Sequence, residues 1–422
     1  MGKCKVGFVG LTHLGLVSAA VAAEKGFSVV CFDRDQNKID LLKGFVSEII
    51  EPQLIELLKK NIDSVTFTAC HNALADCELV YVAPDVSTDG GGNSDLSVID
   101  DALNVAIQAT SEMTTLVVLS QVPPGYTRRY ASFRRDIFYQ VETLVFGDAV
   151  NRALHPERII VGSQYVDKQL PACYQSFLDV FGCEVLVMRY ESAELAKIAI
   201  NMFLISSITT TNMLAELCEK IGANWYEIAP SLRLDRRIGR NAYLNPGLGF
   251  SGGNLERDLA TIIRLSYKHG TDAGVARAWV SNNKWRRAWA FRLLSSTVLS
   301  NLSNPIVAVL GLSYKENTNS VKNSPAVQLI DSIRDVRVKV YDPVIDIIET
   351  RNHMTVYANS ALDAICGVDA VLIMTPWPEF SEITFNDIKR QMKGDVVIDP
   401  FGMLKDQYIH TRGIRYFSLG TQ

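Results

Sequence analysis

Residues 5–20, KVGFVGLTHLGLVSAA, decide the fold of the first part of the chain. An apolar run of strand length ends at Gly10, and a helical pattern follows it. In a dinucleotide-binding turn the first glycine makes the tight turn, the middle one admits the pyrophosphate, and the last lets helix and strand pack closely. Here these positions hold Gly10, Thr12 and Gly15. The Thr12 side chain either displaces or weakens a bound dinucleotide, or its hydroxyl donates to a phosphate oxygen.

An acidic residue in the expected place supports this interpretation. Asp33 ends the next strand-like run, VVCFD, eighteen residues past Gly15. A carboxylate there accepts hydrogen bonds from both ribose hydroxyls and repels a 2′-phosphate, so NAD is favoured over NADP. The alternative is that Asp33 only caps the following helix, since Asp35 and Lys38 come next. The turn residues His13 and Leu14 are predicted to bind the cofactor together with Gly10, Thr12, Gly15 and Asp33.

Apolar runs and helical patterns alternate outward from this turn. Continuous β-branched runs are typical of buried parallel strands, and strand–helix alternation predicts a doubly wound α/β sheet. We expect strands at 5–10, 27–33, 64–69, 78–84, 115–121, 158–162 and 183–188, with helices between them, such as 14–25 and 38–44.

The rest of the chain predicts a helical connector and a second α/β region. A long helical pattern runs from about 192 to 222, and further helices are expected at 224–232, 255–269 and 274–298. Strands are expected again at 306–311, 337–342, 370–375 and 395–399. The fold class is therefore α/β, with two Rossmann-like doubly wound domains joined by a long central helix and helical connector. The predicted domain boundaries are 1–190, 191–302 and 303–422.

Composition excludes several classes of protein. The 422 residues are 48% hydrophobic and 21% charged with a net charge of −4, so neither a disordered chain nor a nucleic-acid-binding surface is expected. The uncharged stretch 198–215 contains too many Ser, Thr and Asn for a membrane span, and no membrane partner is expected. The eight cysteines form neither CxxC nor a zinc pattern. We expect a cytoplasmic protein without disulfides or metal.

The ordered motifs of nearly the whole chain resemble those of the UDP-glucose/GDP-mannose dehydrogenases. The motifs are VGFVGLTHLGLVS, EPQLIELL, DLSVID, SQVPPGYT, LHPERIIVG, AELAKIAINMFL, DRRIGRNAYLNPGLGFSGGNLERDL, VLGLSYKENTNSVKNSPA and VYDP. The resemblance implies an enzyme of polysaccharide biosynthesis that oxidises C6 of a nucleotide-linked hexose twice, with NAD and a cysteine thioester. It also implies that 1–190 binds NAD, that 191–302 carries the substrate loop and the contacts of a homodimer formed through the long helix, and that 303–422 binds the nucleotide sugar.

The resemblance assigns catalytic roles. Lys197 and Asn201, at i and i+4 of the long helix, would hold a water and stabilise oxyanion character at C6, with Asp258 as the accompanying proton acceptor. The alternative is a Lys–Asp ion pair in a helix bundle. Glu142 aligns with a hydrolytic glutamate in a poorly kept motif, and is otherwise an ordinary surface carboxylate. Gln121 replaces a threonine of the cofactor site.

Asn254 occupies the position of the nucleophilic cysteine. The glycine-rich loop of the family ends in Gly-Gly-Ser-Cys-x-x-Lys-Asp, and here Ser251 to Asp258 reads SGGNLERD. A thiolate adds to an aldehyde to give a thiohemiacetal, which loses a second hydride to become a thioester, whereas an amide nitrogen is not nucleophilic. The four-electron mechanism therefore fails as written.

Substrate contacts are implied at several further positions. Arg237 would reach the sugar nucleotide across a dimer, and the loop around Tyr243 and Phe250 would meet the pyrophosphate; a structural turn is the alternative. The predicted substrate-binding residues are Thr143, Leu144, Arg237, Tyr243, Phe250, Gly252, Gly253 and Lys315. The C-terminal Asp-Gly-Arg of the family is Asp399-Pro400-Phe401, so one arginine is missing.

Three functions remain open. The first is oxidation of a UDP-glucose-like sugar to the aldehyde, or an epimerase-type reaction that recycles the hydride. The second is full oxidation through the aldehyde hydrate, with Glu142 or Asp258 as base. The third is a nucleotide-sugar-binding paralogue without turnover.

The first prediction concerns the choice of cofactor. NAD should bind much more tightly than NADP, because the Asp33 carboxylate pairs with ribose hydroxyls and repels a phosphate. Titration of the protein with each dinucleotide measures both dissociation constants. Equal affinities would contradict the assignment of Asp33.

Overall fold

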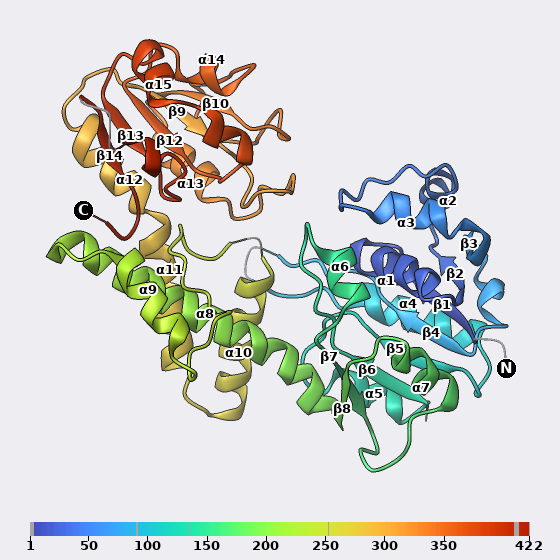
Figure 1. The fold of residues 1–422 in the computed structure, drawn as a ribbon. Helices are drawn as coiled ribbons and strands as arrows, with labels where there is room; N and C mark the ends of the chain where they lie inside the picture. Colours follow the sequence, from blue (N-terminus) through green and yellow to red (C-terminus); the bar gives the residue numbers. More distant parts are fainter. Residues whose placement is uncertain (1–3, 90–91, 135, 252, 409–412, 422) are drawn as a thin grey trace. The chain divides into compact units, whose positions relative to one another are not determined.

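The computed structural model describes residues 4–89, 92–134, 136–251, 253–408 and 413–421. The chain divides into two compact units, Met1–Ile200 (unit 1) and Asn201–Gln422 (unit 2). The division lies within the long helix α8 (Tyr190–Ile221; Figure 1).

Unit 1 is built on a largely parallel sheet. In the described part of the chain the strand order is β3-β2-β1-β4-β5-β6-β7-β8, and only the β6–β7 pair is antiparallel. The strands are β1 (Lys5–Val9), β2 (Ser28–Phe32), β3 (Val65–Thr68), β4 (Leu79–Val82), β5 (Thr115–Val118), β6 (Ile137–Gln140), β7 (Arg158–Ser163) and β8 (Glu184–Arg189). The order turns back on itself at β1, the topological switch point where α/β sheets bind ligands.

Two apolar clusters cover the two faces of this sheet. Leu16 of α1 and Phe177 of α7 belong to one, and Leu103 of α4 and Tyr126 of α5 to the other. Because both faces are covered, the central strands are apolar throughout, and every residue of β4 and β5 is buried. The helices are α1 (His13–Glu24), α2 (Gln36–Lys43), α3 (Leu54–Lys60), α4 (Ser97–Ala109), α5 (Tyr126–Ala131), α6 (Ala149–Leu154) and α7 (Ala172–Asp179).

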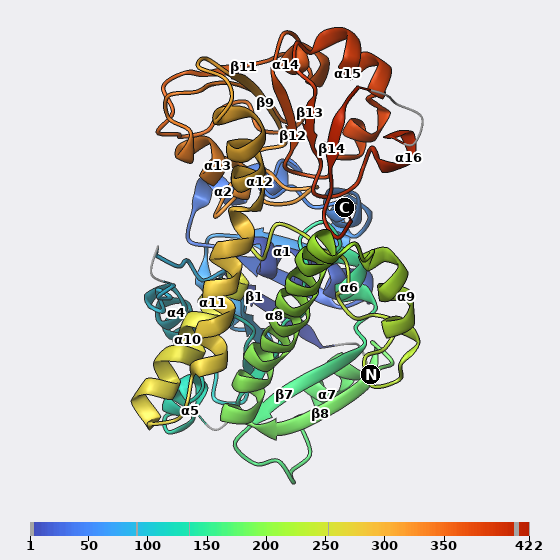
Figure 2. The same ribbon diagram turned by 90° about the vertical axis from the view of Figure 1, so that its left-hand side faces the viewer.

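Unit 2 contains a second sheet, parallel throughout in its described strands. Its order is β11-β10-β9-β12-β13-β14, and Figure 2 shows β9, β12, β13 and β14 side by side. The strands are β9 (Ile306–Leu310), β10 (Arg337–Tyr341), β11 (Thr355–Tyr357), β12 (Ala370–Ile373), β13 (Val396–Ile398) and β14 (Arg415–Phe417). The helices that follow β9 are α13 (Pro325–Ser332), α14 (Ala361–Ile365), α15 (Phe385–Gln391) and α16 (Lys405–Tyr408).

The connector between the sheets is helical. After α8 come α9 (Trp225–Leu234), α10 (Asn254–His269), α11 (Gly274–Arg287) and α12 (Trp289–Leu294). The prediction of a single helix over 274–298 is therefore wrong. The helical segment breaks at Ala288 and ends in a π-helical turn, Ser295–Leu299. Glu216 of α8 pairs with Arg286 and Arg292, which fastens α8 to α11 and α12.

Helix α8 is long and apolar enough to cross a membrane by length and composition alone. Its best 18-residue window has a mean hydropathy of 1.4, and 39% of that window is buried. Core helices of soluble proteins pass the same test, so this property assigns no membrane location.

The predicted fold class is confirmed by two parallel-dominated sheets and the long helix between them. The expected strands are present, but β6, β11 and β14 were not foreseen. β11 and β14 consist of partly buried and exposed residues, so they lack the continuous apolar run that indicated the equally short β13. The division into three domains stays a prediction.

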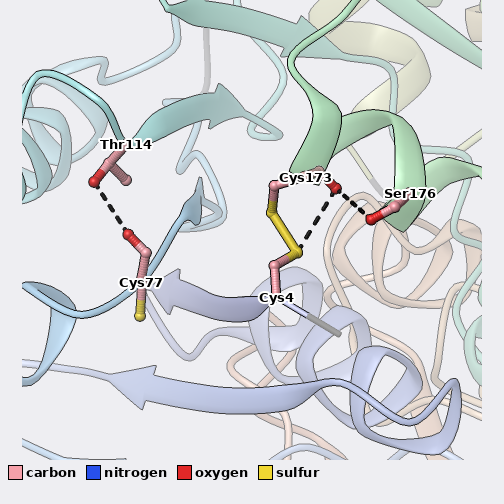
Figure 3. The surroundings of a disulfide bond; sticks show 5 residues. All are labelled: Cys4, Cys77, Thr114, Cys173 and Ser176. Carbon is pink, nitrogen blue, oxygen red and sulfur yellow. Dashed lines mark hydrogen bonds between the residues drawn. A yellow bond between two sulfur atoms is a disulfide. The ribbon is translucent and has the colours of Figure 1, made fainter. Parts of the chain in front are cut away.

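The structure corrects the expectation that no disulfide forms. Cys4, just before β1, is bonded to Cys173 of α7, with their Cα atoms 6.0 Å apart (Figure 3). The two residues are 169 positions apart, and only the packing of α7 against the sheet brings them together. Disulfides persist mainly in oxidising compartments, so this bond is at odds with the cytoplasmic location expected from the sequence.

Removal of this bond should destabilise unit 1. Replacing Cys4 and Cys173 by serine is expected to lower the free energy of unfolding by about 2–4 kcal/mol, because the unfolded chain gains freedom. Denaturant titration measures the change, and Cys70→Ser, at an exposed free cysteine, is the control. Peptide mapping that finds Cys4 and Cys173 as free thiols in the native protein would contradict the prediction.

Candidate functional site

The turn between β1 and α1 leaves no room for side chains at its two glycines. Gly10 has φ +91°, and a Cβ there would lie 2.9 Å from the Pro84 nitrogen. A Cβ on Gly15 would lie 1.9 Å from the Gly10 carbonyl oxygen. Both glycines are therefore required by the close packing of strand, turn and helix.

Thr12 connects this turn to the segment after β4. Its hydroxyl accepts from the Asp85 amide at 2.8 Å and donates to the Ala83 carbonyl at 3.2 Å. Thr12 is the N-cap residue of α1, but its side chain makes no capping hydrogen bond to the helix. The hydroxyl proton is therefore used within the protein, and donation to a phosphate oxygen would require it to leave Ala83.

Asp33 lies just after β2 and points its carboxylate at the turn. Oδ2 accepts from the Leu11 amide at 3.0 Å and from Lys38 Nζ at 2.9 Å, and Oδ1 accepts from the Asp35 amide at 3.1 Å. The residue that caps α2 is Asp35 and not Asp33, because the Asp35 side chain accepts hydrogen bonds from the Asn37 and Lys38 amides. The glycine turn and this carboxylate fit an NAD molecule, whose pyrophosphate and ribose they would hold.

His13 is buried and bonded to a residue that sequence reasoning missed. His13 Nε2 lies 2.8 Å from Glu51 Oε2, and its ring stacks on Phe146 at 4.2 Å. Glu51 also accepts from the Gly147 and Ala149 amides. Glu51 thus links His13, the first residue of α1, to the loop after Glu142. The His13–Glu51 contact therefore stabilises the cofactor turn. Glu51 is the first residue of the EPQLIELL motif, and this motif is the sequence feature from which its role could have been predicted.

Glu142 and Lys197 form a close ion pair within unit 1. Lys197 Nζ lies 2.6 Å from Glu142 Oε1, and the side chains are 11% and 15% exposed. The Leu144 amide donates to Glu142 Oε2, and the Thr143 carbonyl accepts from Arg152 Nε. The alternative of Glu142 as an ordinary surface carboxylate does not fit this partly buried pair. Gln121 lies just beyond the end of β5.

A second polar cluster lies between α8 and α10 in unit 2. Asn201 Nδ2 donates to Asp258 Oδ2 at 2.5 Å, and Arg257 Nε donates to Asp258 Oδ1 at 3.1 Å. Asp258 is only 1% exposed, and a buried carboxylate requires a partner of opposite charge. Arg257, the preceding residue, is that partner. The contact in unit 1 is thus Lys197 with Glu142 and the contact in unit 2 is Asn201 with Asp258, and the Lys197–Asp258 ion pair stays a prediction.

Asn254 is the first residue of α10 and is exposed. Two cysteines belong to unit 2. Cys218 is buried with Trp225 and Leu244, and Cys366 is the exposed residue that ends α14. In the described part of unit 2, neither packs in the cluster around Phe250 and α10.

The loop from Tyr243 to Gly253 is held by side chains of α8 and α11. Its Tyr243 carbonyl accepts from Ser207 and Thr211, and the Phe250 amide and carbonyl bond to Asn283. Phe250 is buried and Tyr243 is half exposed. Gly253 has φ +117°, and a Cβ there would meet the Lys322 side chain at 3.1 Å. Gly252 lies outside the described residues.

Two predicted substrate residues lie apart from this loop. Lys315 follows β9, with its Nζ 5.9 Å from the Tyr314 ring centre. Arg237 is exposed and bonds Asp235 with two nitrogens, at 3.0 and 2.6 Å. No group of three or more potential metal ligands is found among the described residues.

Comparison with known proteins identifies the domains in order. The NAD-binding domain model of the UDP-glucose/GDP-mannose dehydrogenase family matches residues 4–177, its central domain model 191–285, and its UDP-binding domain model 308–406.

Individual relatives match over nearly their full length. The chain is 30% identical to UDP-glucose 6-dehydrogenase of Rickettsia conorii, covering 98% of this chain and 99% of the relative. It is 29% identical to UDP-glucose 6-dehydrogenase TuaD of Bacillus subtilis, covering 99% and 93%. A solved UDP-glucose dehydrogenase from Pyrobaculum islandicum matches with TM-score 0.82 and 26% identity, covering 94% of each chain.

These matches settle the general chemistry. The cofactor is NAD, the substrate is a nucleotide sugar, and the reaction class is that of dehydrogenases acting on CH–OH donors. The Rossmann turn expected from the sequence lies within the match to the NAD-binding domain model. The expected second α/β region contains the match to the UDP-binding domain model. The chain therefore belongs to the UDP-glucose/GDP-mannose dehydrogenase family.

Proposed function

We propose that the protein oxidises C6 of a UDP-linked hexose and, having no thiol at position 254, stops at the aldehyde or returns the hydride to an isomerised sugar. The observation that carries the proposal is Asn254, exposed in the first turn of α10, three residues before the Arg257–Asp258 pair. The UDP-binding match over 308–406 supports a UDP-linked sugar.

The first oxidation needs a base and a group that stabilises negative charge on oxygen. NAD, when bound, accepts the hydride from C6. The hydroxyl proton would pass to the Lys197–Glu142 pair, whose 2.6 Å contact holds an ammonium and a carboxylate together. In this proposal Lys197 stabilises the developing alkoxide and Glu142 accepts the proton.

Asn201 has a positioned role in the same step. Its side-chain nitrogen Nδ2 donates to Asp258. The side-chain oxygen Oδ1 of Asn201 can then accept a hydrogen bond from a water or a substrate hydroxyl. The Asp258 carboxylate is bonded to Asn201 and Arg257, and we assign it the positioning of Asn201. Lys197 and Asn201 are four residues apart on α8.

The second oxidation is where this chain departs from the family. An aldehyde has no hydride to lose until a nucleophile adds to its carbonyl carbon. The nitrogen lone pair of Asn254 is delocalised into its carbonyl, so it does not add as a thiolate does. An aldehyde at C6 acidifies the C5 hydrogen, so proton loss and return at C5, followed by hydride return to C6, would isomerise the sugar without net NADH.

A second candidate is complete oxidation through the aldehyde hydrate, and the intact Lys197–Glu142 pair favours it. Glu142 could remove a proton from water as it adds to the aldehyde, and the hydrate could then lose a second hydride. In a third candidate, a binding protein without turnover, neither NADH nor isomerised sugar would form.

The proposal extends to assembly and location. Met213, Leu217 and Ile221 recur every four residues along α8 and are 53%, 50% and 66% exposed. This row is more apolar than an exposed helix normally tolerates, so we propose a homodimer formed through α8. The proposed partners include neither nucleic acid nor membrane, and the cytoplasmic location expected from the sequence would require Cys4 and Cys173 to be reduced there.

Asn254 provides the test of the chemistry. During turnover with NAD and UDP-glucose, the wild-type chain should carry no covalent sugar in intact-protein mass spectra. Asn254→Cys should form an acyl adduct and regain part of the second step, whereas Asn254→Ala, the control, should not. Rescue should be partial because Gln121 and the Glu142 motif also differ from the family. An acyl adduct on the wild-type chain would contradict the proposal.

Arg237 provides the test of the dimer. Light scattering at micromolar concentration should give twice the chain mass. Arg237→Ala should raise the KM for the sugar nucleotide roughly tenfold, through loss of a charged hydrogen bond, while the dimer persists. Arg236→Ala, at the exposed neighbouring position, is the matched control. A monomer, or equal KM values for the two variants, would contradict the prediction.

A further inference from the structure

The segment that follows β4 lies directly on the cofactor turn and brings a carboxylate with it. Its Pro84 packs against Gly10, where even a methyl group would clash. Asp85 donates its amide to the Thr12 hydroxyl at 2.8 Å, and Thr12 donates on to Ala83. The backbone of Asp85 is therefore fixed beside the N-cap residue of α1.

The N-terminus of α1, whose residues are all described, has no acceptor of its own. The Thr12 side chain makes no capping hydrogen bond, and the first turn contains no acidic residue. The first amides of a helix have no intrahelical acceptor and carry partial positive charge, and dinucleotide-binding proteins use this end to hold a pyrophosphate.

The groups around the Asp85 carboxyl are those of the same helix end. Desolvation raises the pKa of Asp85, and the neighbouring Glu142 carboxylate raises it further. His13, the Thr12 hydroxyl and the Leu14 amide act in the opposite direction and lower that pKa. Asp85 is exposed, and its backbone amide, bonded to the Thr12 hydroxyl at 2.8 Å, holds its carboxyl within reach of the start of α1. His13 and Glu142 are in turn bonded to Glu51 and Lys197.

We propose that the Asp85 carboxylate competes with the cofactor pyrophosphate for the N-terminus of α1 and thereby sets a low affinity for NAD. The pyrophosphate carries two negative charges and seeks the same helix end, so the two anions repel at close range. Binding then requires Asp85 to turn away or to take up a proton. Asp85 is an affinity-determining residue in this proposal, and it takes no part in the chemistry.

A dependence on pH follows from this competition. As the pH falls through the raised pKa of Asp85, the carboxyl becomes neutral and NAD should bind more tightly. His13 and Glu142 face the same carboxyl, and protonation of either also favours an anionic ligand. The contribution of Asp85 is therefore the part of the pH dependence of NAD affinity that the wild type shows and Asp85→Asn lacks.

The decisive comparison is the dissociation constant for NAD in wild type, Asp85→Asn and Asp85→Ala, measured by calorimetry at neutral pH. Both variants should bind NAD roughly tenfold more tightly, since one nearby like charge is removed. Asp76→Asn, the control, makes the same charge change at an exposed side chain that pairs with Lys5. Its affinity should match wild type.

Thermal unfolding without cofactor gives an independent readout. Loss of a carboxylate near a helix N-terminus should lower the melting temperature of both Asp85 variants slightly while their NAD affinity rises. A purely structural role would lower both quantities together. Unchanged or weaker NAD binding in folded Asp85→Asn overturns the proposal, as does binding too weak to measure in both wild type and variant. None of these outcomes depends on turnover of a sugar, so they are separate from tests of the proposed function.

Discussion

The β1–α1 turn is the constraint on which the site of unit 1 depends. A side chain at Gly15 would run into the Gly10 carbonyl, and one at Gly10 would run into Pro84. With both glycines the helix starts close to the end of the strand, and its first amides, which have no acceptor within the helix, are the groups that hold a phosphate in dinucleotide-binding folds. Three acidic residues then contact the turn and the start of α1 from different segments: Asp33 after β2 and Glu51 before α3 through their carboxylates, and Asp85 after β4 through its backbone amide.

Each unit contributes a polar pair whose partners are already in contact. Glu142 and Lys197 neutralise each other in unit 1, and Arg257 compensates Asp258, which orients Asn201, in unit 2. Charged groups that are fixed before substrate binds lose little freedom when they act, which favours the first oxidation. In the proposed mechanism the nucleophile of the second oxidation is absent, because Asn254 supplies an amide.

Local patterns predicted much of this architecture. The runs LVYV and TLVV are typical of buried parallel strands, and the glycines and Asp33 predicted the NAD-binding domain that matches residues 4–177. Contacts between distant segments could not be predicted in this way. The Cys4–Cys173 bond, the His13–Glu51 pair and the choice of Glu142 as partner for Lys197 depend on how helices pack on the sheet. Strand β14 has exposed and partly buried residues, so it lacks the continuous apolar run that indicates a buried strand, and its place is set by its neighbour in the sheet.

The central claim is that Asn254 limits this chain to at most one net hydride per sugar. It is tested most directly by counting NADH formed per molecule of UDP-glucose consumed, with NAD in excess and the sugar product identified by mass spectrometry. The account predicts at most one NADH per sugar, accompanied by the C6 aldehyde, or isomerised sugar without NADH. Two NADH per sugar, with the C6 carboxylic acid as product, would contradict it.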